Sequence, residues 1–118
     1  MMVVLPDSLP AINSNVRAHW AVRARETREW RETVGWLARA ERAGDLGRID
    51  VVLHATPPDR RRRDRHNLTP CLKAALDGLV DAEVVADDTP EFVRADRVEL
   101  HEPDGVRRWR WRIEVTAV

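Results

Sequence analysis

Residues able to bind a metal ion occur in two places along this 118-residue chain. Asp64 and His66 stand two positions apart, and Asp87 and Asp88 form an adjacent pair further along. Carboxylate oxygens with one imidazole make a hard, open donor set that suits Mg²⁺ or Mn²⁺, with water completing the shell. In a purely structural role, Asp64 would cap a turn and the Asp87-Asp88 pair would begin one. The spacing leaves both interpretations open.

A strongly basic segment surrounds the first of these places. Residues 59–68 read DRRRRDRHNL, and five of six consecutive positions are arginines: Arg60, Arg61, Arg62, Arg63 and Arg65. The positive charges of such a run repel one another, which disfavours a purely structural role. Guanidinium groups also bind phosphates through paired hydrogen bonds. We therefore predict that this segment binds a phosphate backbone. Arg108, Arg110 and Arg112 alternate near the C-terminus, and either phosphate binding or a solvated sheet face explains them.

Lys73 is the only lysine of the chain. It follows Thr69 by a little over one helical turn, toward the end of the helix where Asp64 lies. An ammonium group there could neutralise charge that develops on a scissile phosphate. The alternative is an ordinary solvent-facing helix lysine. No glycine-rich phosphate loop or nucleophilic Ser/His/Asp set accompanies it, and the single cysteine, Cys71, is predicted to be buried on the apolar face of this helix.

The hydrophobic pattern predicts the elements that must position these residues. A single α/β domain, residues 1–118, is expected to have the order β-α-β-α-β-β, with two helices on one face of a small mixed sheet. The expected helices cover about 20–43, ending before Gly44, and Thr69-Pro70 to about 80, with Thr69 as N-cap. The expected strands cover 2–5, 49–56 and about 92–101, and a final strand follows a turn at Pro103-Asp104-Gly105 and runs to the C-terminus.

The tryptophans extend this pattern. Trp109 and Trp111 alternate with arginines on the last strand, which predicts one buried and one wet face. Trp20 and Trp30 follow the core periodicity of the first helix, and Trp36 is out of phase and expected to be exposed.

Composition and charge bound the function. Hydrophobic residues make up 43% and charged residues 34%, and no apolar run is long enough to span a bilayer. The residues MMVVLPDSLP lack the basic start and long apolar stretch typical of a secretory signal. We therefore expect a cytoplasmic protein without membrane attachment. The net charge is zero, but residues 1–65 carry thirteen arginines against nine acids, and residues 66–106 carry three basic residues against ten acids. This segregation fits a metal-binding centre flanked by phosphate-binding surfaces.

Two stretches together resemble a known family. PPDRRRRDRHNL, followed by LKAALDGLVDAEVVADD, is similar to the RusA family of Holliday junction resolvases, and LPAINSNVRAH resembles the opening of that family more loosely. Its members are small homodimeric endonucleases, dependent on Mg²⁺ or Mn²⁺, that act on four-way DNA junctions. The resemblance implies the same activity, cofactor and partners here.

The resemblance also assigns roles to residues. Asp64 matches the first metal-binding aspartate, Asp88 with Asp87 matches the last acidic ligand, and Lys73 matches the catalytic lysine. Asn67 matches the following asparagine. With the arginine run, Asn67 and the opening residues Asn15 and Arg17 are expected to contact DNA.

Two departures from the family pattern bear on catalysis. His66 stands where the family has a second aspartate, and three residues are inserted between Leu68 and Lys73 relative to the shortest members. A neutral imidazole brings no negative charge, so His66 should weaken Mg²⁺ binding and favour Mn²⁺ or a softer metal. The alternative to a nuclease is therefore a RusA-like DNA-binding protein whose catalysis is impaired.

Overall fold

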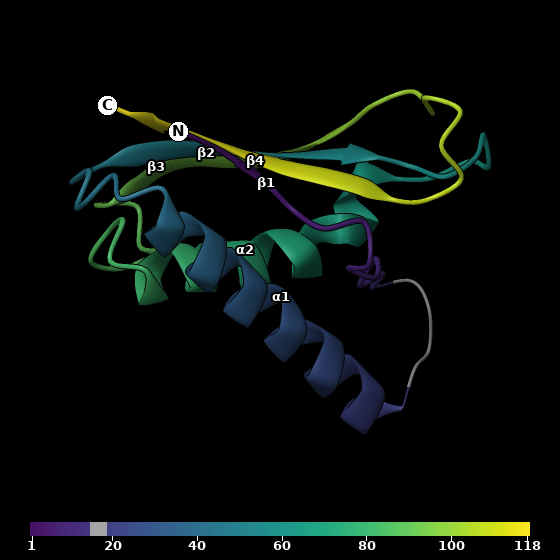
Figure 1. Cartoon of the computed structure of the whole chain (residues 1–118), viewed down its shortest axis with the longest axis horizontal. Helices are drawn as coiled ribbons and strands as arrows, with labels where there is room; N and C mark the ends of the chain where they lie inside the picture. The colour runs from purple at the N-terminus through teal and green to yellow at the C-terminus, as the bar shows by residue number, and fades with distance from the viewer. Residues whose placement is uncertain (15–18) are drawn as a thin grey trace.

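The computed structural model of the chain describes residues 1–14 and 19–118. Along the chain, the elements are β1 (Met2–Val4), α1 (Trp20–Ala40), β2 (Ile49–Thr56), the 3-10 helix η1 (Arg65–Leu68), α2 (Thr69–Asp81), β3 (Val93–Leu100) and β4 (Arg110–Ala117). Figure 1 shows one mixed sheet with the two long helices beneath it. The predicted α/β fold and its element order are confirmed.

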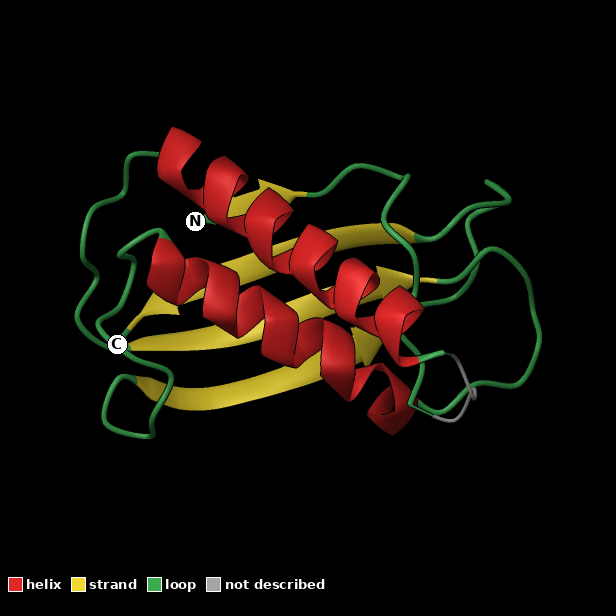
Figure 2. Cartoon of the chain, turned by 90° about the horizontal axis from the view of Figure 1, so that it is seen from below, coloured by secondary structure: helices red, strands yellow, loops and turns green. Residues whose placement is uncertain are grey.

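The sheet has the strand order β1-β4-β2-β3, and both helices lie across the same face of it (Figure 2). β4 runs antiparallel to β1 and β2, whereas β2 and β3 are parallel neighbours. A parallel pair needs a crossover connection, which η1 and α2 supply here. The crossover brings the C-terminal ends of β2 and β3 to the same end of the sheet. The arginine-rich loop and His101 both start there.

The core lies between the sheet and the helices. On β4, Trp111 and Ile113 are buried while Arg110 and Arg112 are exposed, so the predicted alternation is confirmed. Trp30 of α1 meets Trp111 edge to face, with ring centroids 4.8 Å apart. Each indole N–H donates a hydrogen bond to a carbonyl of the loop after β1: Trp30 to Pro10 at 2.6 Å and Trp111 to Leu9 at 3.2 Å. The indole N–H groups of the two buried tryptophans are therefore both paired.

The two helices approach each other most closely at Gly78 of α2. A Cβ atom there would lie 2.7 Å from the carbonyl oxygen of Arg31 and 2.8 Å from the Cβ of Val34, both on α1. Only glycine fits so close a backbone approach. Next to this crossing, the Arg31 guanidinium pairs with Asp81 at 2.6 Å.

Several details differ from the sequence prediction. Trp20 is 76% exposed, because α1 is inclined to the sheet and its first turns lie away from it (Figure 1). α1 ends at Ala40, before the predicted end, and the chain turns at Arg42, whose φ is 54°. Thr69 is the first residue of α2 and not its N-cap, because η1 leads directly into the helix. Trp36 is exposed and Cys71 is buried, as predicted.

Candidate functional site

The arginine-rich loop forms one wall of an open pocket of about 910 Å³. The loop after β1, the segment that leads into η1, η1 itself and the end of β3 contribute its lining: Asn13, Arg62, Arg63, Asp64, Arg65, Asn67, Glu99 and Leu100. Three of the five predicted phosphate-binding arginines therefore share one pocket with Asp64 and Asn67. The remaining two, Arg60 and Arg61, line a neighbouring surface pocket with His101 and Glu102.

Arg63 differs from the other arginines of this segment because its side chain is only 17% exposed. Its guanidinium donates hydrogen bonds to the backbone carbonyl and to the carboxylate of Asp59, both at 2.8 Å. It also lies over the indole of Trp109, with its central carbon 5.1 Å from the ring centroid. The carboxyl of Asp59 accepts hydrogen bonds from the backbone N–H of Arg61 and from the Arg63 guanidinium. The first of these has the larger effect, and together they hold the pKa of Asp59 below its usual value. Arg63 therefore orders the loop.

The other arginines are more accessible. Arg60 is 3.6 Å from Glu102 and Arg61 is 3.6 Å from Asp59, and both arginine side chains are more than 80% exposed. Such ion pairs are weak and exchange readily for a stronger anionic partner. Arg62 and Arg65 are exposed and form no ion pair with any residue that the structure describes. These two guanidinium groups are the free positive charges of the pocket.

Asp64 and His66 lie together at the entry to η1. One carboxylate oxygen of Asp64, Oδ1, accepts the backbone N–H of His66 at 2.9 Å and is 3.2 Å from His66 Nδ1. The structural interpretation of Asp64, as the cap of a turn, is therefore confirmed. Both side chains remain largely exposed, so the cap does not prevent Asp64 from meeting a ligand in the pocket.

Asn67 contributes its backbone to this region. Its N–H donates to the carbonyl of Asp64 at 3.0 Å, and its carbonyl accepts the N–H of Ser14 at 2.9 Å. The loop after β1 is thereby tied to η1. The two further predicted DNA contacts, Asn15 and Arg17, lie outside the described residues.

Lys73 and Asp88 form an ion pair, and the same ammonium donates to Asp77 Oδ1 at 2.9 Å. The hydrogen bond to Asp88, followed by that to Asp77, raises the pKa of Lys73, while Lys73 lowers the pKa of Asp88. The lysine is therefore held protonated and the aspartate ionised. Asp87 accepts the backbone N–H of Asp88 at 2.8 Å, so it supports the loop that carries the pair.

The four predicted metal ligands do not gather around one point. In residues 1–14 and 19–118, no three of Asp64, His66, Asp87 and Asp88 offer ligand atoms within 4.8 Å of one another. Asp64 and His66 precede α2, whereas Asp88 lies beside Lys73, four residues into that helix, and is already paired with its ammonium. As arranged here, this set does not fit a single Mg²⁺ or Mn²⁺ ion.

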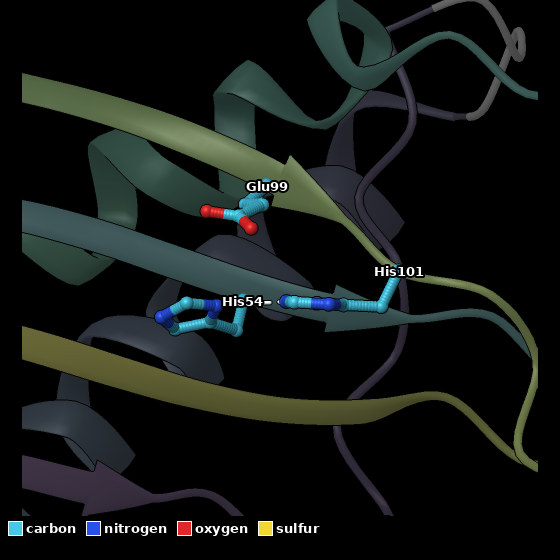
Figure 3. Close-up of side chains that lie close together, drawn as sticks. All are labelled: His54, Glu99 and His101. Carbon is cyan, nitrogen blue, oxygen red and sulfur yellow. Dashed lines mark hydrogen bonds between the residues drawn. The ribbon is translucent and has the colours of Figure 1, made fainter.

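A different donor set does gather, on the face of the sheet opposite the helices. His54 of β2, Glu99 of β3 and His101 offer ligand atoms that all lie within 4.8 Å of one another (Figure 3). The sequence prediction missed this cluster. Its signal was present, because Glu99 and His101 stand two positions apart on one strand face and His54 occupies the polar face of another strand.

None of the protein-family models matches the chain, and none of the curated proteins matches its sequence. Among the residues described, no helix has the length and apolar character needed to cross a membrane.

Proposed function

We propose that this chain is a structure-selective endonuclease that cuts four-way DNA junctions and depends on Mg²⁺ or Mn²⁺. One observation carries the proposal: the free guanidinium groups of Arg62 and Arg65 line a single open pocket on either side of Asp64 in the chain. With the RusA-like order of residues, this pocket supports a site where a DNA phosphate meets a carboxylate of the protein.

The pocket favours recognition of the backbone over recognition of bases. Its free donors are arginines, which bind phosphates irrespective of sequence, and Arg60 and Arg61 extend the positive surface beyond its rim. Contacts of this kind position a protein on a branched substrate by the path of its backbone. Selectivity for a junction would then come from the shape of the DNA.

Lys73 would stabilise negative charge on the phosphate under attack. Its two carboxylate partners keep it protonated and anchor it beside Asp88, and its side chain remains 60% exposed. To meet a phosphate, the ammonium would exchange one of these carboxylates for a phosphate oxygen. Cutting two strands of a junction symmetrically needs two such sites, and hence a two-fold homodimer.

The second candidate function is junction binding without cleavage. Two observations favour it: His66 replaces the second aspartate of the family pattern, and the predicted ligands do not gather around one point. An arginine-lined pocket is sufficient for binding. This candidate predicts the same affinity for junction DNA as the nuclease candidate does, but no metal-dependent cutting.

The test is cleavage of a synthetic four-way junction with Mg²⁺, with Mn²⁺ and with a chelator. We expect metal-dependent nicking that Asp64→Asn and Lys73→Met reduce at least about 100-fold, a typical cost of losing a transition-state contact. Glu29→Gln on α1, an exposed acid with no assigned role, is the matched control. No cleavage with either ion would overturn the nuclease, and recovery of cutting in His66→Asp would then identify a disabled site. Equal affinity for junction and linear duplex would overturn both candidates.

A further inference from the structure

We propose that His54, Glu99 and His101 form a binding site for Zn²⁺ or a similar imidazole-preferring metal ion. Its ligands differ from the Asp64 and Asp88 carboxylates, and the proposal does not depend on the nuclease proposal. Its three ligand atoms lie within 4.8 Å of one another, and His54 Nδ1 is 2.8 Å from His101 Nε2. Figure 3 shows the two imidazoles and the carboxylate side by side on the open face of the sheet.

The backbone holds the three ligands in place. His54 and Glu99 are directly paired in the register of the parallel strands β2 and β3, so their side chains lie on the same face. His101 continues this pairing beyond β3, because its N–H donates to the carbonyl of Ala55 at 2.8 Å. Ligands fixed by a sheet need little reorganisation before they bind an ion.

Metal-binding histidines usually donate their second ring N–H to a carboxylate, and Glu114 of β4 supplies that carboxylate here. Its Oε1 is 2.9 Å from His54 Nε2, and His54 is 91% buried between the neighbouring strands. Because the Glu114 carboxylate accepts this hydrogen bond, Nε2 of His54 carries the proton. The lone pair of His54 Nδ1 is then directed toward His101. Glu114 thus sets both the tautomer and the ring orientation that a ligand histidine needs.

The donor types select the metal. Two imidazoles and one carboxylate, with a further position open to solvent, make the open coordination set typical of zinc, and imidazole favours Zn²⁺ over Mg²⁺. At Zn–N distances of about 2.0–2.1 Å, two tetrahedral ligands stand about 3.4 Å apart. The imidazole nitrogens would therefore separate by about 0.6 Å from their present spacing, a small rotation for His101 at the end of its strand.

Glu99 is available to the ion. Its present partner is Arg97, at 3.2 Å, and both side chains are more than 40% exposed, so the pair is weak. Exchanging an exposed arginine for a divalent cation would cost little.

The alternative is a hydrogen-bonded chain from Glu114 through His54 to His101 that binds no metal. Calorimetric titration of the chelator-treated full chain with Zn²⁺ separates the two, and the visible spectrum of bound Co²⁺ reports the geometry. We expect one Zn²⁺ per chain. His101→Ala and Glu99→Gln should remove this binding, and Glu114→Gln should weaken it about 10–100-fold through the lost outer carboxylate.

The matched controls are His66→Ala and His19→Ala, which remove the two histidines outside the cluster and should leave Zn²⁺ affinity unchanged. Far-ultraviolet circular dichroism establishes that each variant is folded, and Glu99→Gln decides the question if His101→Ala does not fold. The proposal is overturned if wild type shows no stoichiometric binding, or if Glu99→Gln retains full affinity, or if His66→Ala abolishes it.

Discussion

The guanidinium of Arg63 lies over the indole of Trp109, 5.1 Å from the ring centroid, and thereby joins the arginine-rich loop to the segment that enters β4. Arg62, the preceding residue, lines the same pocket but forms no ion pair with any residue the structure describes. Two neighbouring residues of one type thus have different environments. Their substitutions should separate folding from DNA binding.

Arg63→Ala should lower the free energy of unfolding by about 1–3 kcal/mol, because it removes the hydrogen bonds to Asp59 and the contact with Trp109. Arg62→Ala should leave stability within about 0.5 kcal/mol of wild type, as exposed substitutions usually do. Urea denaturation followed by tryptophan fluorescence measures both. Equal losses for the two variants would contradict the structural role of Arg63.

Arg62→Ala and Arg65→Ala should instead weaken junction binding. If each guanidinium contacts one phosphate, each variant should reduce the slope of log K against log salt by about 1. Anisotropy titrations of a labelled junction at several salt concentrations measure the slope. Arg28→Ala, an exposed arginine on α1, is the control of equal charge, and an equal reduction there would mean that net charge alone governs binding.

Asp88→Asn should remove a pH-dependent contribution to stability. Because the folded pKa of Asp88 is lowered, its contribution is present above the unfolded value of about 3.9 and is lost as the pH falls through the folded pKa. Lys73 sets the limit at high pH, because its pKa is raised in the folded protein. The contribution of the ion pair is lost as the pH rises through the folded pKa of Lys73, above about 10.4.

Between these limits the pair should contribute about 0.2–1 kcal/mol, the range for exposed ion pairs. Chemical denaturation of wild type and Asp88→Asn from acid to neutral pH measures the difference, which should shrink in acid. Glu91→Gln, an exposed acid on the same loop, should show no such change. A difference between wild type and Asp88→Asn that is constant with pH would contradict the ion pair.

Gly78→Ala should destabilise the protein by about 1–3 kcal/mol, because the new Cβ would press on the backbone of α1 at Arg31. Gly35→Ala makes the same chemical change on α1, where the Cβ would meet its nearest neighbour at 3.5 Å. Helix propensity should then stabilise this variant by up to about 1 kcal/mol. Thermal unfolding compares the two, and a tolerated Gly78→Ala would contradict the close crossing.

Cys71 should resist thiol reagents in the folded protein. Burial raises the pKa of its thiol to about 12, and its sulfur accepts the backbone N–H of Ile12 at 3.2 Å. At pH 8, the thiolate population should be roughly 1,000-fold lower than that of a free cysteine. Labelling rates with a disulfide reagent, with and without denaturant, measure this protection, and rapid labelling of the folded protein would contradict it.

Local patterns predicted most of the fold. The alternation along β4 is contained in 8 residues and the apolar repeat of α2 in 13, so both could be recognised without knowledge of the rest of the chain. The exposure of Trp20 could not be predicted in this way, because the periodicity of a helix does not reveal how the helix is inclined to the sheet.

The arrangement of the site residues depends on contacts between segments far apart in the sequence, which local patterns do not contain. His54 and Glu99 meet only through the register of a parallel pair joined by a long crossover. The contact of Arg63 with Trp109 requires knowing how the loop before β4 returns, and a run of identical arginines does not indicate which one becomes buried. The position of Asp88 beside Lys73 likewise depends on the path of the loop after α2.

Glu99 belongs both to the lining of the arginine pocket and to the histidine cluster. A cation held by His54, Glu99 and His101 would cancel a negative charge that otherwise repels phosphate from the pocket. Binding of the cation and binding of DNA would then be coupled by a single free energy. By thermodynamic reciprocity, DNA would tighten the hold on the ion by the same factor by which the ion tightens the hold on DNA.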